Sequence, residues 1–422
     1  MAESAVYLVD ELIPLVPVRQ FVVTFPPPLR LWLARSAELA TTVCAKVIEC
    51  LNRHLQRESG VGAGLTGCVV FMQRFGSAAN LNVHLHIIAL DGAYEKKSTG
   101  RLKFYNTIAP TKESTTKLVH DIAKRINNHL LRKGYLEHHE DLVLLGNTEE
   151  IFACNNDELH LPAQAASVGH RIAFGPNAGK PVRRLKLGNS LWPSEDDVEV
   201  SSDACVNVGG YSVHAATAVK LYERDRLERL VRYMARPAIA DERLSVLPNG
   251  DIKLKLKTPW RDGTESILFT PSEFIERLIA LIPIPRFHLT RYYGVLAARS
   301  EHRKSLPDRP ERKEAMDEDS PPQQPPLLNK KRGKKRVGWA ALLKRTFKID
   351  VLQCHKCGSR MQLVDVVLHA ALIATTLKAI GVSPRAPPIA PARSVGVFGF
   401  DEAFIDSDCI DLAYNNEETL SS

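Results

Sequence analysis

The spacing of apolar residues predicts two kinds of element in the first third of the chain. Runs of β-branched and aromatic residues bounded by Pro, Gly or Asn are typical of strands, and they occur at 21–25, 67–75 and 83–90. Apolar residues recurring every three or four positions are typical of amphipathic helices, and they occur at 39–51 and at 118–130, where Ser114 is the expected N-cap. A mixed α+β chain with antiparallel neighbouring strands is therefore expected.

The pattern is less regular beyond these elements. Residues 140–200 are punctuated by Gly and Pro, which predicts short strands and loops. A helical pattern covers 215–235 and ends before Pro237, and another covers 272–281. Between them, DIKLKLK at 251–257 alternates strictly, which predicts a strand with a basic outer face.

Changes in composition predict the domain organisation. A stretch rich in proline and charge, with few aromatic residues, indicates a disordered linker. We expect an N-terminal strand and helix at 1–60, a core at 61–240 and a β-rich extension at 241–300. The flexible linker is expected at 301–336, a small module with a cysteine pair at 337–382, and an acidic, disordered tail at 383–422.

Charge and hydropathy narrow the classes of partner. The 422 residues carry a formal net charge of +8, which favours an anionic partner such as nucleic acid without proving one. The N-terminus lacks the basic region of a signal peptide, and no apolar run reaches the length of a membrane span. A cytoplasmic protein with no membrane contact is expected.

The stretch NLNVHLHIIALDG places His84 and His86 on one face of a strand, because alternate residues of a strand share a face. If 67–75 and 83–90 form a hairpin centred near Ala78 and Ala79, Gln73 lies opposite His84. Two imidazoles and an amide oxygen suit Mg²⁺ or Mn²⁺. The alternative is a pair of hydrogen-bonded sheet histidines, and a one-residue slip in register would turn Gln73 away.

A second feature is the helix at 225–240, which combines an apolar stripe with several arginines and Tyr233. One arginine side chain can donate two hydrogen bonds to a phosphate group, and nearby positive charge favours the phenolate form of a tyrosine. The alternative is an ordinary surface tyrosine of an amphipathic helix. Together with a metal at His84 and His86, Tyr233 suggests attack on a phosphodiester and a covalent 5′-phosphotyrosine intermediate.

Six stretches occur along the chain in this order: FVVTFPPPLR, FMQRFGSAANLNVHLHIIALDG, GGYSVHA, RLERLVRYMARPAIADERLSVLPNG, TPWRDGT and RFHLTRYYGVLA. Together they resemble the rolling-circle transposases of the IS-ninety-one class. These belong to the HUH superfamily of single-strand nucleases, named for a His-hydrophobe-His motif. The similarity covers nearly the whole chain and is specific when the stretches are taken together, whereas HLH alone would not be.

This resemblance implies roles for individual residues. His84 and His86 match the metal-binding histidines, Tyr233 matches the nucleophile, and Gln73 is the expected third ligand. The implied fold is an antiparallel HUH-type sheet with the histidines on a central strand and the tyrosine on a facing helix. His214 lies in the matching GGYSVHA stretch, where a core or turn role is as plausible as one in the active site.

Two departures from the family pattern stand out. Many relatives carry a second tyrosine four residues before the nucleophile, where this chain has Arg229, so it resembles the single-tyrosine branch. Relatives also begin with a cysteine-rich zinc-binding domain that is absent here, so a truncated copy is one interpretation. We expect Arg229 and Arg232 to contact DNA phosphates.

Cys354 and Cys357 have the spacing of a zinc knuckle, but a closed zinc site needs four ligands and the chain lacks a second such pair. The resemblance favours Zn²⁺, and the alternative is a reduced thiol pair.

These features predict a transposase that nicks and transfers single-stranded DNA at the ends of a mobile element and joins it to target DNA. Two alternatives stay open: a replication initiator or relaxase with the same chemistry, and a truncated DNA-binding remnant without catalysis.

Overall fold

The structure is a computed structural model that describes most of the chain, namely residues 2–139, 142–145, 159–186, 204–260, 262–307, 338–362, 367 and 369–381. The chain divides into two units. Of the described residues, the larger unit contains 12–307 and the smaller contains 2–11 and those from 338 onward. The predicted linker from residue 308 onward and the predicted acidic tail lie outside the described residues.

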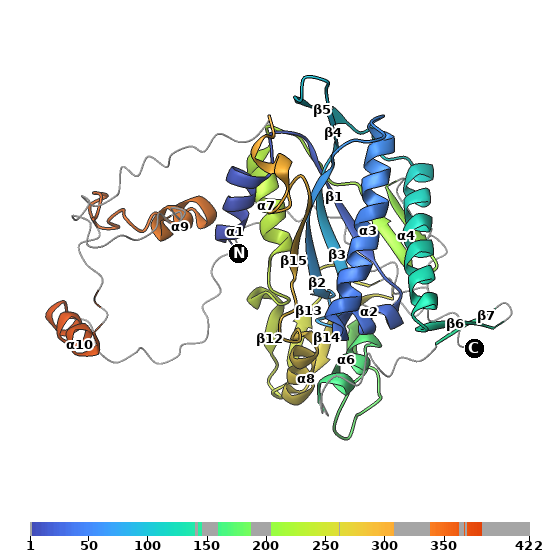
Figure 1. Ribbon diagram of the computed structural model, residues 1–422. Coiled ribbons are helices and arrows are strands. Elements are labelled where there is room, and N and C mark those ends of the chain that lie inside the picture. Colours follow the sequence, from blue (N-terminus) through green and yellow to red (C-terminus); the bar gives the residue numbers. More distant parts are fainter. Residues whose placement is uncertain are drawn as a thin grey trace. The chain divides into compact units, whose positions relative to one another are not determined.

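A seven-stranded antiparallel sheet forms the centre of the larger unit (Figure 1). Its order is β15-β2-β3-β1-β10-β9, with β11 paired to β1, so β3 lies in the interior of the sheet. The strands are β1 (Val18–Thr24), β2 (Gly67–Phe75), β3 (Leu81–Leu90), β9 (Cys205–Val208), β10 (Tyr211–His214), β11 (Ala218–Val219) and β15 (Thr290–Gly294). The expected α+β class with an antiparallel sheet is confirmed.

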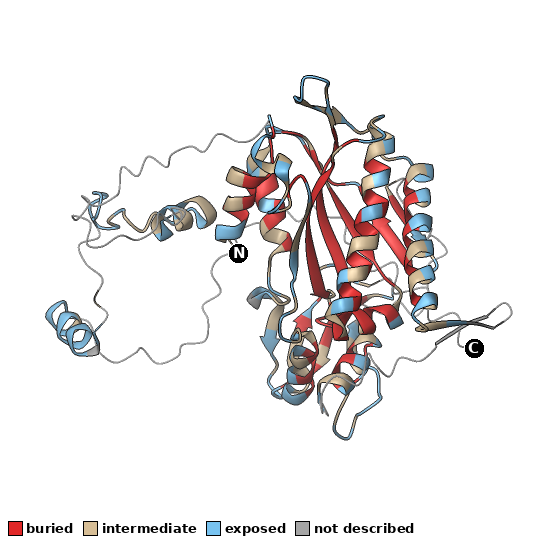
Figure 2. Cartoon of the chain, viewed as in Figure 1, coloured by how far each residue is buried: buried red, intermediate tan, exposed pale blue. Residues whose placement is uncertain are grey.

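The two faces of this sheet differ in chemistry. Alternate strand residues such as Val23, Val70 and Leu85 join the main apolar core under the helices α2 (Pro27–Arg35), α3 (Ala37–Glu58) and α4 (Lys112–Arg132). The residues between them point to the other face, where α7 (Arg224–Met234) lies (Figure 1). Both faces are buried along the central strands (Figure 2). Strand alternation therefore separates an apolar face from a face that carries the histidines.

A smaller four-stranded sheet has the order β12-β13-β14-β8. Its core includes Ala78 and Ala79 from the β2–β3 loop, which attaches it to one end of the central hairpin. The nearby elements are α6 (His160–Val168), β8 (Arg183–Lys186), a 3-10 turn (Asp241–Arg243), β12 (Leu244–Val246), β13 (Ile252–Lys255), β14 (Thr264–Phe269) and α8 (Pro271–Leu281).

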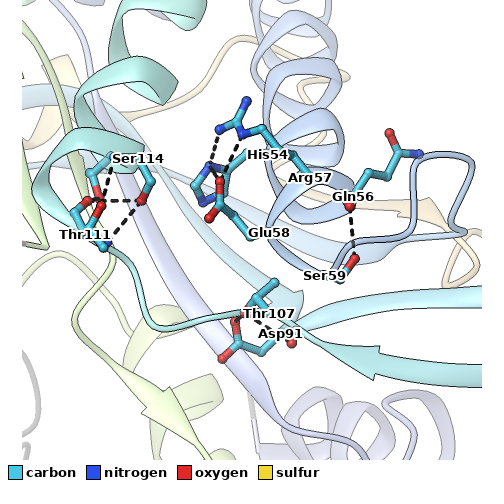
Figure 3. Close-up of polar contacts among 10 residues, drawn as sticks. His54, Gln56, Arg57, Glu58, Ser59, Asp91, Thr107, Thr111 and Ser114 are labelled. Carbon is cyan, nitrogen blue, oxygen red and sulfur yellow. Dashed lines mark hydrogen bonds and ion pairs between the residues drawn. The ribbon is translucent and has the colours of Figure 1, made fainter.

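Two further hairpins are β4–β5 (Gly92–Lys96, Leu102–Asn106) and β6–β7 (Leu136–His139, Leu142–Leu145). Asp-Gly is a common turn dipeptide, but here β4 begins at Gly92 directly after β3. Asp91 instead accepts two hydrogen bonds from Arg19, at 2.9 and 2.7 Å, and one from Thr107 (Figure 3). A Cβ at position 92 would lie 2.0 Å from the Tyr105 carbonyl oxygen, so only glycine fits there.

Three helix boundaries differ from the predictions. The helix α2, which begins at Pro27 and Pro28, was not predicted. Proline is accepted in the first turn of a helix because the backbone N–H groups there have no partner within the helix. The N-cap of α4 is Thr111, in a capping box with Ser114 (Figure 3). The helix expected from residue 215 begins only at Arg224, because Ala218–Val219 pairs with β1 instead.

The smaller unit contains α1 (Ala2–Tyr7), α9 (Trp339–Phe347) and α10 (Ala370–Ala379), and a π-helical turn (Leu8–Leu12) follows α1. Within it, Arg345 and Asp10 form an ion pair. In the larger unit, a 3-10 turn (Glu301–Lys304) lies near the end of the described residues. Among the described residues, no helix is both long and apolar enough for a membrane crossing.

The free energy of unfolding should fall as the pH is lowered from about 6.5 to about 4. Burial in α3 lowers the pKa of His54 to about 4, so in that window the unfolded chain binds a proton that the folded chain does not. The His54 contribution lost over the whole window is about 3 kcal/mol. Urea unfolding at several pH values measures it. Figure 3 shows His54 beside Arg57 and Glu58. In His54→Gln the slope of the free energy of unfolding against pH should decrease by the equivalent of about one proton, and an unchanged slope would contradict this assignment.

Candidate functional site

His84 and His86 lie on β3 and point away from the main core. The expected register is confirmed: Gln73 of β2 pairs with His84, and Phe71 pairs with His86. On the other side, β1 places Thr24 opposite His84 and Val22 opposite His86. Both histidines are almost fully buried.

The two imidazoles converge through their Nε2 atoms, which are 3.1 Å apart. His84 Nδ1 donates a hydrogen bond to the Asn82 carbonyl oxygen at 2.8 Å, which leaves its Nε2 with a lone pair. Burial lowers the pKa of His84 to about 4, and burial and the charge of its neighbours lower the pKa of His86 well below 6.5. Both side chains are therefore neutral at pH 7, the state in which imidazole binds a metal.

Gln20 of β1 is a site residue that the sequence reasoning missed. Its side chain is fully buried, and its Nε2 atom donates a hydrogen bond to His86 Nδ1 at 2.9 Å. The Oε1 atom of the same amide has no hydrogen-bond partner in the described part of the chain. Rotating the amide by half a turn would present Oε1 to an Nδ1–H group, so Gln20 can support either tautomer of His86.

The donor set fits a divalent metal ion. Two nitrogens that each lie about 2.1 Å from one ion are about 3 Å apart when they subtend a right angle at it, close to the observed separation. Within the described ranges there is no cluster of three His, Cys, Asp or Glu side chains that could hold a metal. Further ligands must then be of another type, such as the Gln73 amide oxygen, water or a substrate oxygen.

Tyr233 lies in the last turn of α7, beside the histidine pair. Its ring centroid is 6.4 Å from that of His86, in an edge-on arrangement. The apolar stripe that fixes this side of the helix is Leu227, Leu230, Val231 and Met234, all buried, whereas Tyr233 itself is half-buried.

Two cations bind the Tyr233 hydroxyl oxygen. Arg236 donates from Nη2 at 3.1 Å, and Lys257, just beyond β13, donates from Nζ at 2.9 Å. Both charges also lie over the ring, 4.0 and 4.4 Å from its centroid. Charge-assisted donors of this kind stabilise negative charge on the oxygen that they contact. Neither residue was assigned to the site from the sequence.

Gln73 connects the sheet to this helix. Its Nε2 atom donates a hydrogen bond of 2.7 Å to the Met234 carbonyl oxygen, one residue beyond Tyr233. Because the nitrogen is committed as a donor, Oε1 is the atom left for a ligand role. The contact also holds the end of α7 against β2, a positioning role that the sequence did not predict.

The remaining predicted residues are Arg229, Arg232 and His214. Arg229 is exposed, one turn before Tyr233, in a shallow hollow of about 350 Å³ that is also lined by residues 222–226, while Arg232 is half-buried. His214 of β10 is buried and pairs with Val22, so it shares the face of His84 and His86. Contacts of Arg229 and Arg232 with DNA stay predictions.

Cys354 and Cys357 lie in a tight turn of the smaller unit. The Gly358 amide donates to the Cys354 carbonyl and the Cys354 amide to that of Ser359. Hydrogen bonds from Ser359 and Cys354 lower the pKa of Cys357, which favours the thiolate. The described residues supply no four-ligand set around the pair, and Zn²⁺ binding stays a prediction.

The comparison with protein families gives one match. A family model described as "Putative transposase" (Y2_Tnp) matches residues 67–304, more than half of the chain. The matched range contains Gln73, His84, His86, Tyr233 and Lys257. No curated protein and no solved structure matches the chain.

Gln20→Met should weaken Mn²⁺ binding by about 10- to 100-fold, the usual effect of losing the outer partner of a metal-bound histidine. The variant keeps the length of the side chain but can neither donate a hydrogen bond to His86 Nδ1, as Gln20 does, nor accept one from it. Gln20→Glu, whose carboxylate can accept a hydrogen bond from the Nδ1–H tautomer of His86, should bind at least as tightly as the unaltered protein. Isothermal titration with MnCl₂ measures both. Unchanged affinity in Gln20→Met would show that Gln20 does not orient His86.

Proposed function

Because the chain belongs to the Y2_Tnp transposase family, we propose that it nicks one DNA strand at the ends of a mobile element through a 5′-phosphotyrosine intermediate. One observation carries the proposal: a tyrosine hydroxyl held by two cations lies beside two neutral imidazoles whose Nε2 atoms converge to 3.1 Å. Transposases act on DNA, so a phosphodiester is the expected substrate.

In the proposed reaction the Tyr233 oxygen attacks phosphorus, the bond from phosphorus to O3′ breaks, and the leaving oxygen takes a proton to become a 3′-hydroxyl. The 5′-phosphate stays on Tyr233 until a 3′-hydroxyl of a target strand attacks it and restores the phenol. Arg236 and Lys257 stabilise the phenolate before attack, and the same cations lie next to the phosphate afterwards.

His84 and His86 are the proposed ligands of Mg²⁺ or Mn²⁺, with the Gln73 oxygen as a third. A divalent ion there would polarise the phosphate and orient it for attack. Gln20 and the Asn82 carbonyl orient the two rings from behind, as outer partners commonly do in metal sites.

The position one turn before Tyr233 supports a single-tyrosine mechanism. Side chains four residues apart share a face of a helix, and here that position is Arg229, which is exposed. An exchange between two tyrosines on this helix is then not available. Arg229 and Arg232 are proposed to contact phosphates next to the one under attack.

Covalent trapping tests the nucleophile and the metal together. Protein, Mn²⁺ and labelled single-stranded DNA that spans the element's ends should give a protein–DNA adduct on a denaturing gel. Tyr233→Phe and the double variant His84→Ala/His86→Ala should both abolish the adduct.

The controls separate the possible failures. Tyr222→Phe changes a tyrosine just before α7 and should leave the adduct intact. An adduct that survives Tyr233→Phe would refute this nucleophile. DNA binding without any adduct, on ends known to be mobile, would favour the non-catalytic alternative. Adducts on a plasmid origin instead of element ends would favour an initiator or relaxase.

Lys257→Met should slow adduct formation by about 100-fold or more, because removal of one preorganised electrostatic donor usually costs that much. The loss should appear in the rate at saturating DNA and should be partly restored in Lys257→Arg, which keeps the charge. A single-turnover time course measures both rates. Equal rates in Lys257→Met and the unaltered protein would show that this contact does not assist the tyrosine.

A further inference from the structure

A row of lysines runs along one face of β13 and its extension. Lys253, Lys255 and Lys257 alternate with Leu254 and Leu256, which are buried in the small core of the four-stranded sheet. Alternation places Lys253 and Lys255 together on the opposite face, about 7 Å apart, and Lys257 follows in the bend after the strand. We call these three residues the lysine row.

The row ends at the proposed nucleophile. Lys257 donates a hydrogen bond to the Tyr233 oxygen, and Lys255 and Lys253 follow at increasing distance from it along the strand. Arg243 holds this part of the strand in place by donating a hydrogen bond of 2.7 Å from Nε to the Lys255 carbonyl oxygen. The line of positive charge is therefore continuous with the candidate active site.

The outer two lysines are available to a ligand. Lys255 is exposed and Lys253 is half-buried, and in the described part of the chain neither has an acidic partner. By contrast, Arg183 and Arg184 on the same sheet pair with Asp251 and Asp262.

The side chains beside the row on the neighbouring strands carry no charge. Lys253 has two register partners, Ser245 and the half-buried Leu268, and the buried Ser266 is the register partner of Lys255. Serine side chains are too short to cover a lysine ammonium group. A linear anion with regularly spaced charges could therefore lie along the strand.

We propose that Lys253 and Lys255 bind the phosphate backbone of single-stranded DNA and lead it to Tyr233. The inference rests on the proposed function, because a strand must reach the tyrosine for nicking. The spacing of the row resembles that of successive phosphates in an extended strand, whereas a duplex would present its two backbones across a much wider surface. Lysine contacts phosphate as a point charge, so the row adds affinity without reading sequence.

The test compares two double variants of the full chain that lose the same charge. One is Lys253→Gln/Lys255→Gln. The matched control is Lys117→Gln/Lys124→Gln, two exposed lysines of α4 on the opposite side of the seven-stranded sheet. Binding of a labelled oligothymidylate is measured by fluorescence anisotropy over a range of salt concentrations.

Loss of two phosphate contacts on a single strand should make the slope of log affinity against log salt shallower by about 1.4, which corresponds to about 25-fold weaker binding at about 0.1 M salt. The control should stay close to the unaltered protein in both respects. Equal weakening in both variants would overturn the proposal, because it would reflect net charge alone. A larger loss for a duplex than for the single strand would overturn it as well.

Binding and chemistry are separated by repeating the measurement in Tyr233→Phe protein. If the unaltered protein forms no adduct but the row variant still loses affinity in the Tyr233→Phe background, the proposed nicking fails and the row stands. If the adduct forms and the row variant binds as tightly as its control, the nicking stands and the row fails.

Discussion

The register of the central strands is the constraint on which the rest of the structure depends. Side chains in a strand alternate between faces, so the pairings of β3 with β1 and β2 decide together which residues face the core and which face α7. A slip of one residue would bury His84 and His86 among the apolar side chains under α3 and expose Leu85 and Ile87 to the polar face. The apolar core therefore protects the arrangement of the histidines.

The polar face is buried too, and this imposes a second requirement. Buried polar groups need hydrogen-bond partners, and here a chain of contacts runs from the Asn82 carbonyl through His84 and His86 to Gln20. The cost of charging a buried imidazole keeps both rings neutral. The same burial that requires this network keeps both rings in the neutral form that the proposed metal ion would need.

The surroundings of Tyr233, the proposed nucleophile, come from three parts of the larger unit. Gln73 on β2 holds the end of α7, the apolar stripe of α7 sets the side on which Tyr233 lies, and Lys257 reaches its oxygen from the four-stranded sheet. The four-stranded sheet therefore contributes directly to the candidate site. It supplies one of the two cations at the tyrosine and carries the surface proposed to guide the DNA strand.

The sequence by itself determined the local periodicities, and with them the strands at 67–75 and 83–90, their hairpin register, and the histidines, Gln73 and Tyr233 as candidates. It failed where a choice depended on distant partners. Ala218–Val219 joined β1 although the surrounding residues suggested helix, and Thr111 capped α4 in place of Ser114. The roles of Gln20, Arg236 and Lys257 were decided only by the tertiary structure. Alternation shows which face a lysine or glutamine occupies, but only packing between β1, β3, α7 and β13 brings those faces to the same atoms.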